Sequence, residues 1–294
     1  MIPPVLAGAL TAVAYAVSTL ASARASRLAD PSAAVAGVMV VGTLVLLPIV
    51  LFVTPIPATA SPGTVGPALV WSTVAGAANV GGLLLAYAAY RIGAVGVVST
   101  IGSTEGAIAA LISVLAGQQL APGAGFALGA VAIGVVLAAT GGGHELEEGV
   151  AISRATSLRA AGLAGCAALL LGSGLFIAGH ASTALPAAWV VLPGRVAGVA
   201  LVTVPLFVFR RPSVSRRALR FIVVTGLAEV VGLVSFSIGA RQDIAVTSVL
   251  GSMFPPIAAV AAFVLFRERL ARRQILGIGV VVAGIGALGA LSST

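Results

Sequence analysis

The sequence predicts an all-α integral membrane protein whose ten transmembrane helices form two inverted five-helix repeats. Three observations predict this fold: the composition, ten apolar stretches and an internal repeat. Of the 294 residues, 59% are hydrophobic and 8% are charged, and the mean hydropathy is +1.15. A soluble domain carries about 25% charged residues. Eight acids and sixteen bases cannot cover a water-facing surface of this size. We therefore expect a multi-pass protein of the cell (plasma) membrane.

Ten stretches of the chain are long and apolar enough to span a bilayer. A helix needs about 20 apolar residues to cross a hydrocarbon core of about 30 Å. Charged residues and clusters of Pro, Gly and Ser separate the stretches. The first stretch has no Lys or Arg before it, unlike a cleaved signal peptide, so we interpret it as a retained span. In chain order, the expected spans are Pro3–Ala23, Ala33–Val53, Gly66–Ala89, Ala94–Leu115, Gly123–Thr140, Ala160–Gly179, Leu185–Phe209, Ala218–Ala240, Ile244–Phe266 and Gln274–Leu291.

The arginines predict the orientation in the membrane. All sixteen basic residues are arginine, and they fall between apolar spans, which is typical of an orientation signal rather than of nucleic-acid binding. If the N-terminus lies outside, Arg241 is the only arginine in the outer joints. Arg195 lies within a span. The positive-inside rule then predicts that both termini lie outside. The fourteen arginines in the cytoplasmic joints are Arg24, Arg27, Arg91, Arg154, Arg159, Arg210, Arg211, Arg216, Arg217, Arg220, Arg267, Arg269, Arg272 and Arg273.

An internal repeat relates the two halves of the chain. Residues 68–121 align without a gap with residues 218–271 at 14 identical positions. Composition alone gives roughly one match in ten, so a repeat explains the identities better. The alignment pairs Asn79 with Glu229, and an offset of 157 residues pairs Gly37 with Gly194. Because five spans is an odd number, the halves enter the membrane in opposite directions. Inverted repeats are a transporter architecture, with the substrate site between the halves.

A polar segment separates the two repeats. We expect residues 1–143 to form the first five-helix repeat, residues 144–159 a polar connecting loop, and residues 160–294 the second repeat. His144 and Glu145 begin like an HExxH zinc motif, but the fifth position of that motif is not histidine, so no metal site is expected. No pair of nucleophile and base with suitable spacing is present, so the sequence does not predict an enzyme.

The second half also resembles a known family. The stretch from Ala245 to Gly289 carries Pro255 thirteen residues before Glu268, followed by Gln274-Ile275-Leu276-Gly277 and Gly284-Ile285-Gly286. This stretch resembles the C-terminal half of an EamA-type carrier of the drug/metabolite transporter superfamily. Leu171-Gly172-Ser173 and Gly194-Arg195 resemble the start of the same repeat.

The resemblance implies a ten-helix membrane carrier of small metabolites or drugs, often an exporter of amino acids or related solutes. It extends over the whole chain but is close only in the second half. In the first half, Glu105 replaces the family proline, Gln118 replaces the family glutamate, and Val38 replaces the family arginine.

Glu105 is the first candidate functional residue. It lies near the middle of the fourth expected span, among the hydroxyl side chains of STIGSTEGAIAA. An ionisable side chain at membrane depth costs about 2.5 to 3.5 kcal/mol on insertion scales, so it needs a partner or a function. We interpret Glu105 as a cavity-lining carboxylate that binds a cationic substrate group or a coupling proton. The alternative is a structural hydrogen bond to a neighbouring helix.

Glu229, Asn79 and Arg195 are the other polar candidates. Glu229 and Asn79 are repeat mates, so both are expected to face the central interface, although Glu229 is also suited to neutralising a nearby base. Arg195 needs an anion, either Glu105, Glu229 or a substrate carboxylate, and the spacing does not choose among them. A structural salt bridge is one interpretation. The other is a cavity-facing arginine, which together with one acid would suit an amino-acid-like substrate.

Prolines predict a broken helix in the ninth span. Pro255 and Pro256 leave the carbonyls of Gly251 and Ser252 without helical donors. Broken backbone at membrane depth is tolerated only where it lines a cavity or contacts protein. We therefore expect this span to face the interior, with Ser252 either capping those carbonyls or contacting substrate.

These features predict a secondary transporter that exports a small polar metabolite, such as an amino acid, by alternating access. Its expected partners are a small-molecule substrate, the lipid bilayer and protons as the coupling ion, with no nucleic acid and no cofactor. An exporter of multidrug or cationic compounds is the alternative carrier, which an aromatic content of 5% disfavours because cation-binding cavities favour aromatic faces. The alternative of another class is a channel or a structural membrane subunit. No filter-like loop or ring of like charge supports a channel.

Overall fold

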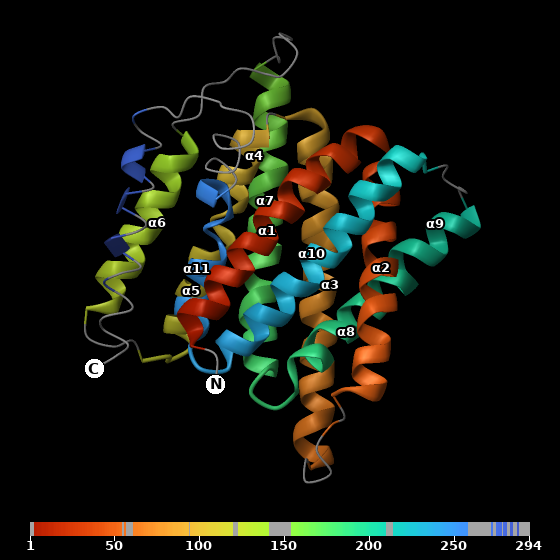
Figure 1. Ribbon diagram of the computed structural model, residues 1–294, viewed down its shortest axis with the longest axis horizontal. Coiled ribbons are helices and arrows are strands. Elements are labelled where there is room, and N and C mark those ends of the chain that lie inside the picture. Colours follow the sequence, from red (N-terminus) through yellow and green to blue (C-terminus); the bar gives the residue numbers. More distant parts are fainter. Residues whose placement is uncertain are drawn as a thin grey trace.

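The computed structural model describes most of the chain as a bundle of helices. The described residues are 3–54, 56, 61–93, 95–119, 123–140, 154–209 and 214–257, with 272, 275–277, 279, 280, 283, 284 and 287. Within them, every regular element is helical, and Figure 1 shows the helices packed side by side with their ends along two opposite edges. In order, the elements are α1 (Pro4–Leu28), α2 (Pro31–Phe52), α3 (Pro62–Ile92), α4 (Val95–Gly102), α5 (Glu105–Leu115), α6 (Ala124–Thr140), α7 (Arg154–Ala181), α8 (Ala187–Gly198), the π-helix η1 (Val199–Thr203), α9 (Val204–Phe209), α10 (Arg216–Ala240) and α11 (Ile244–Gly251).

Six segments of the described chain are long and apolar enough to cross a membrane. They are Pro4–Leu28, Pro31–Phe52, Pro62–Ile92, Leu158–Ala181, Ala187–Phe209 and Arg216–Ala240. These segments correspond to the first, second, third, sixth, seventh and eighth expected spans. The protein is therefore an all-helical, multi-pass membrane protein, and the full set of ten spans stays a prediction.

Some expected elements differ from the structure or lie outside it. Residues 154–159, expected in the connecting loop, form the first turns of α7. Residues 144–153 of that loop, the ninth span beyond Ile257 and most of the tenth span (Gln274–Leu291) lie outside the described residues. The seventh span runs through the π-helix η1. Pro205 follows this segment, and its missing N–H group removes a helical hydrogen bond and favours such a local widening.

The fourth and ninth expected spans are each divided by a turn. The turns occupy residues 103–104 and 252–253, which lie one residue apart in the repeat alignment. Different residues cause them. The first turn follows Gly102 and contains serine and threonine, which are weak helix formers. The second precedes Pro255 and Pro256, which cannot donate helical hydrogen bonds.

The helix packing follows an approximate twofold pattern. The most extensive contacts are those of α3 with α7 and of α1 with α10. Next come α3 with α8 and α10 with α2, and a third couple is α4 with α7 and α11 with α1. Exchanging the two halves of the chain converts the first member of each couple into the second. Of the other large contacts, that of α2 with α8 joins two repeat mates, and that of α5 with α11 joins the fourth expected span to the ninth.

Repeat-related glycines allow the helices to approach closely. A Cβ atom at Gly76 of α3 would overlap the backbone of Gly194 in α8. In the other half, a Cβ at Gly226 of α10 would lie 2.7 Å from Val41 Cβ in α2, and one at Gly37 of α2 would lie 2.6 Å from Ile222 Cγ2. Small residues at such crossings let membrane helices pack backbone to backbone.

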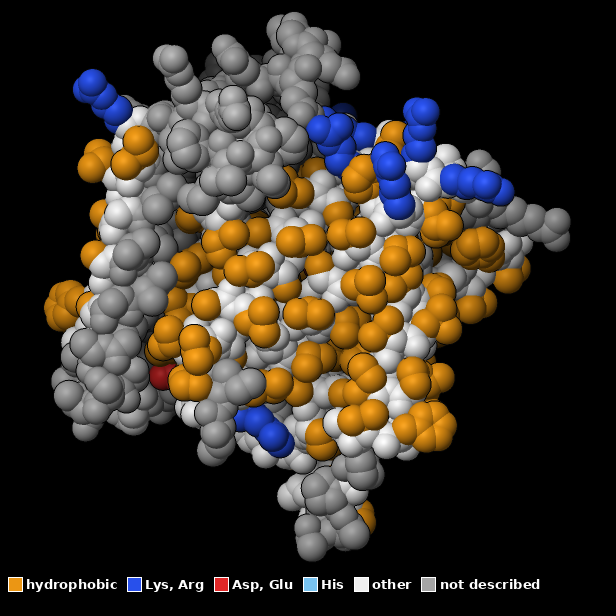
Figure 2. All heavy atoms as spheres, viewed as in Figure 1, with side chains coloured by type: hydrophobic (Ala, Val, Ile, Leu, Met, Phe, Trp, Pro, Cys, Tyr) orange, Lys and Arg blue, Asp and Glu red, His pale blue; other side chains and the backbone are white. Residues whose placement is uncertain are grey.

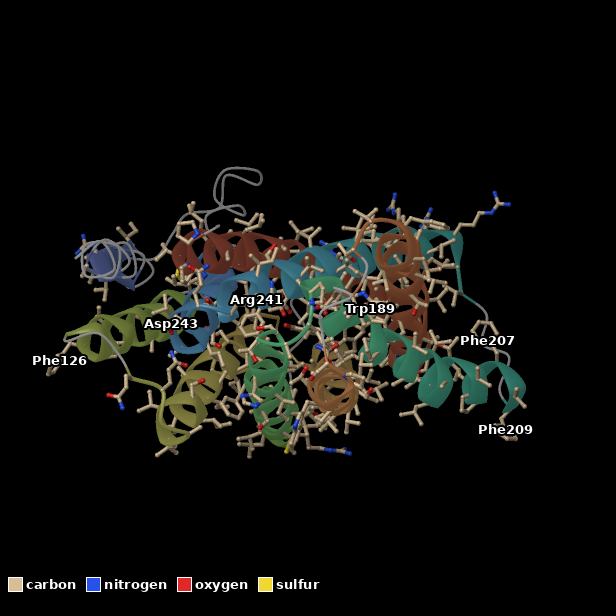
Figure 3. The ribbon with its side chains drawn as sticks, turned by 90° about the horizontal axis from the view of Figure 1, so that it is seen from below. Phe126, Trp189, Phe207, Phe209, Arg241 and Asp243 are labelled. Carbon is tan, nitrogen blue, oxygen red and sulfur yellow. The ribbon has the colours of Figure 1, made fainter. Side chains whose placement is uncertain are left out.

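The outer surface is apolar between two charged edges. Figure 2 shows a broad band of hydrophobic side chains, with most of the visible arginines along one edge. That edge collects the C-terminal ends of α1 and α3 and the N-terminal ends of α7 and α10, where Arg27, Arg91, Arg159 and Arg216 lie. Phe126, Phe207 and Phe209 are exposed and project outward from the bundle in Figure 3. This surface suits a lipid environment.

The close contact of α3 with α8 gives a stability prediction. Gly76→Ala should lower the free energy of unfolding by at least about 1 to 3 kcal/mol, because the added methyl group overlaps packed backbone. Thermal unfolding of the purified protein in detergent measures the effect. Gly66→Ala, on the same helix, is the matched control: no atom lies within 4 Å of its added Cβ, so a gain of up to about 1 kcal/mol is expected. Equal melting temperatures for both variants would contradict this packing.

Candidate functional site

A cavity lies at the centre of the bundle, between the two halves. Residues of α1, α3, α4, α5, α7, α8 and α10 line it, with Phe254 from the segment after α11. The volume open to the centre of a water-sized sphere is about 90 Å³, enough for several waters or a small polar group. Most of its wall is alanine, leucine, valine and glycine, so its polar groups stand out.

Helical spacing explains which residues reach the cavity. On α1 they are Tyr15, Ser18, Thr19 and Ser22, spaced at three and four residues. These positions share one face of a helix. The α1 face therefore forms a polar stripe opposite the apolar wall from α7.

Repeat mates occupy the cavity from both sides. The lining residues on α3 include Asn79 and Leu83, and those on α10 include Glu229 and Leu233. Asn79 aligns with Glu229, and Leu83 with Leu233, in the sequence repeat. The two halves thus present equivalent helix faces to one cavity, which fits a site at the interface of two repeats.

Arg195 is paired with Glu229. One guanidinium nitrogen donates to Glu229 Oε2 at 3.2 Å, and the Ser18 hydroxyl donates to Oε1 at 3.0 Å. A second guanidinium nitrogen lies 3.7 Å from Met39 Sδ. The arginine is 2% exposed and the glutamate 6%. Of the three anions that the sequence left open, the structure selects Glu229, and the pair lies in the cavity wall.

Glu105 is buried without a comparable partner. It is 6% exposed, lines the cavity and is the first residue of α5, directly after the turn that divides the fourth span. Among the described residues, no hydrogen bond or ion pair reaches its carboxylate. It experiences the charge of Glu229 across the cavity. The N-terminal end of α5 favours a negative charge at this position through its unpaired N–H groups.

The remaining candidates from the sequence are placed differently. Asn79 lines the cavity, and its amide makes no hydrogen bond among the described residues. Ser252 is absent from the cavity lining, and its hydroxyl donates to the Val249 carbonyl at 2.9 Å, within the turn after α11. Pro255 and Pro256 are buried behind the lining residue Phe254. Ser252 thus caps a nearby carbonyl in this structure.

Sequence reasoning missed the aromatic residues of the site. The chain has three tyrosines, and all three (Tyr15, Tyr87 and Tyr90) line the cavity together with Phe254. Tyr15 and Phe254 are in edge-to-face contact, with ring centroids 6.3 Å apart. The low aromatic content of the whole chain therefore says nothing about the aromatic content of its cavity. The three- and four-residue spacing of Asn79, Leu83, Tyr87 and Tyr90 was the available signal.

A second hollow lies at the opposite edge from most arginines. Trp71, His180 and Arg241 are among its lining residues. The Arg241 side chain donates to the backbone carbonyls of Ser182 and Leu185, and Figure 3 shows it near the middle of this edge. His180 is therefore remote from the central acids. Within the described part of the chain, no group of three His, Cys, Asp or Glu side chains is placed to hold a metal ion.

Comparison with protein families gives a match over the first half of the chain. Residues 2–140 match the EamA-like transporter family. This is the half in which Val38, Glu105 and Gln118 depart from the family pattern, so these departures do not remove it from the family. A search among curated proteins gives no match.

A comparison with solved structures also gives matches. Twenty-four chains match. One, described only as "Crystal structure of protein", has a TM-score of 0.72 and 17% sequence identity, over 98% of this chain and 96% of that chain. At this identity the likeness shows the fold alone.

The buried ion pair gives a prediction that tests whether Arg195 and Glu229 stabilise the fold through their contact. Arg195→Met and Glu229→Gln should each lower the free energy of unfolding by about 3 to 5 kcal/mol, because each leaves a buried polar group without its partner. The combined variant should recover much of this loss. Unfolding in mixed micelles, analysed as a double-mutant cycle, measures the coupling.

The matched control for this cycle is the exposed pair Arg91–Asp30, whose charged atoms lie 3.6 Å apart. Removing either of these residues should cost less than about 1 kcal/mol. If the losses at Arg195 and Glu229 simply add in the combined variant, the two side chains are not energetically coupled.

Proposed function

Because the match over residues 2–140 makes this chain an EamA-type member of the drug/metabolite transporter superfamily, we propose that it is a secondary transporter that exports a small polar metabolite by alternating access. The single observation that carries the proposal is the central cavity, which is lined by repeat-related helix faces and contains a buried carboxylate, Glu105, that has no partner among the described residues. A purely structural membrane subunit has no need of such a group.

The helix arrangement supports an alternating-access mechanism. We infer ten spans in two inverted repeats for two reasons. The helix contacts come in pairs that are interconverted when the two halves of the chain are exchanged, and the helix breaks fall at nearly equivalent positions. Inverted repeats give two conformations of similar energy, in which one half rocks against the other around a central site. Residues at the break between α4 and α5 (Gly102 and Glu105) and after the break that follows α11 (Phe254) line the cavity, so these breaks can supply the hinge.

The charged residues receive different roles in this proposal. Glu105 is the substrate or proton site, because it faces the cavity and is unpaired among the described residues. Glu229 of α10 and Arg195 of α8 stabilise the packing of their helices, and the pair that they form has no net charge. Asn79 is a candidate hydrogen-bonding contact for substrate. Ser252 and the two prolines shape the break after α11 rather than contacting substrate.

Orientation and direction follow from the arginine-rich edge. The positive-inside rule places that edge in the cytoplasm and both termini outside. Export driven by proton entry then requires a group that binds a proton and substrate in turn, and Glu105 is the candidate. The other charged and titratable groups that line the cavity, within the described part of the chain, are Glu229, Arg195, Tyr15, Tyr87 and Tyr90.

A transport assay tests the function. Proteoliposomes containing the purified protein and an internal pH indicator should show a substrate-induced pH change when a library of small metabolites is screened. In Glu105→Gln the pH change should fall at least about tenfold, because the amide cannot exchange a proton.

Asp30→Asn is the control, since it removes a half-exposed carboxylate outside the cavity and should leave the signal unchanged. Transport that is unaffected when Glu105→Gln and Glu229→Gln are combined would overturn the roles assigned here. The absence of a pH change with transport still measurable by a labelled solute would remove proton coupling alone.

A further inference from the structure

The cavity carries a charge imbalance that bears on the charge of the substrate. Two carboxylates and one guanidinium line it: Glu105, Glu229 and Arg195. The guanidinium is committed to Glu229. Among the described lining residues, the ionised site therefore has a net charge of one negative unit, located on Glu105.

We propose that this transporter selects organic monocations, consisting of one ammonium group on an apolar or aromatic body, over zwitterionic amino acids. The inference rests on the proposed function and narrows its substrate class. The ammonium group would pair with Glu105, the one lining carboxylate that lacks a counter-charge among the described residues. A charge-assisted hydrogen bond in a water-poor cavity is stronger than one at a surface.

A substrate carboxylate finds no comparable partner. Arg195 is the only cation among the described lining residues, it is 2% exposed, and its nitrogens contact Glu229 and Met39. An amino acid would have to break that pair, which leaves Glu229 buried with only the Ser18 hydroxyl. Breaking a buried ion pair by removing one partner costs several kcal/mol. The geometry therefore disfavours the zwitterionic substrate that the sequence suggested.

Aromatic rings supply the second element of cation recognition. Tyr15 and Tyr90 line the same cavity as Glu105 and Glu229. The Tyr15 ring is fixed by its edge-to-face contact with Phe254 and by packing on Gly232, where an added Cβ would lie 2.5 Å from Tyr15 Cε1. A fixed ring in the wall of a cavity that also holds a carboxylate can bind a cation through its face.

The apolar wall completes the substrate description. Leu171, Leu175, Val190 and Leu233 line the same cavity as the acids. They offer no hydrogen-bonding group for a second polar end of a substrate. A molecule with one cationic end and an apolar body matches this division.

Two matched series of ligands test the proposal on the full chain in nanodiscs. The first is phenethylamine, phenylalanine and 3-phenylpropionate, and the second is butylamine, norvaline and pentanoate. Within each series the body is shared and the charge runs from cation through zwitterion to anion. Calorimetric titration should give the amine an affinity about tenfold to a hundredfold above that of its amino acid, with the anion weakest.

Variants connect the preference to the named residues. Glu105→Gln should abolish the preference for the amine, Glu105→Asp should retain it, and Asp30→Asn should leave it unchanged. Tyr15→Phe should bind the amines like the native chain. Tyr15→Leu should bind them about threefold to thirtyfold more weakly, because only the aromatic variant keeps the ring face.

The outcomes separate this inference from the proposed function. Equal or tighter binding of both amino acids, or failure of both amines to bind, overturns the cation preference even if the pH-change screen reveals transport. Amine binding that depends on Glu105, in a protein that transports no solute in the screen, supports the cation site and overturns the proposed function. A preference for amines that persists in Glu105→Gln also overturns the proposal.

Discussion

The ion pair between Arg195 and Glu229 is the contact around which the membrane-embedded part of this structure is organised. A guanidinium at this depth requires an anion, and a carboxylate requires donors. Ser18 of α1 supplies a further donor, and Gly42 of α2 makes room for the arginine stem, since a Cβ at this glycine would lie 2.9 Å from Arg195 Cδ. Helices α1, α2, α8 and α10 therefore meet at a single charged contact that joins both halves of the chain.

The charges are asymmetric although the scaffold is nearly symmetric. The repeat mate of Arg195 is Val38 and that of Glu229 is Asn79, so neither residue of the ion pair has a charged counterpart in the first repeat. The first repeat instead contributes Glu105, which aligns with Pro255. Among the described residues that line the cavity, one half of the bundle thus contributes an ion pair and the other contributes one unpaired acid. The framework is nearly symmetric, but its ionisable groups differ between the halves. We propose that this difference leaves Glu105 as the position for a mobile positive charge.

Much of the fold was predictable because the bilayer imposes strong constraints on sequence. Hydropathy and arginine positions gave the six long spans, and the repeat gave the equivalence of Asn79 and Glu229, because these patterns are local or periodic. The turn before Glu105 was missed, since Gly-Ser-Thr is only weakly unfavourable to helix while Pro255-Pro256 is decisive. The partner of Arg195 and the gathering of three tyrosines depend on contacts between distant helices. Sequence spacing within one helix does not determine such contacts.

The position of Glu105 links substrate charge to helix movement. This residue starts α5 at the turn dividing the fourth span, and α5 packs on α7 and α11 of the other half. An ionised carboxylate is costly to seal in a dry cavity, whereas one that is paired or protonated is not. In the mechanism that we propose, closure of the halves around the cavity would cost less free energy with a cation or a proton on Glu105 than with the ionised carboxylate alone. Such a carrier would exchange one positive charge for another, so the proposed coupling between proton and substrate needs only this one carboxylate, which is unpaired among the described residues.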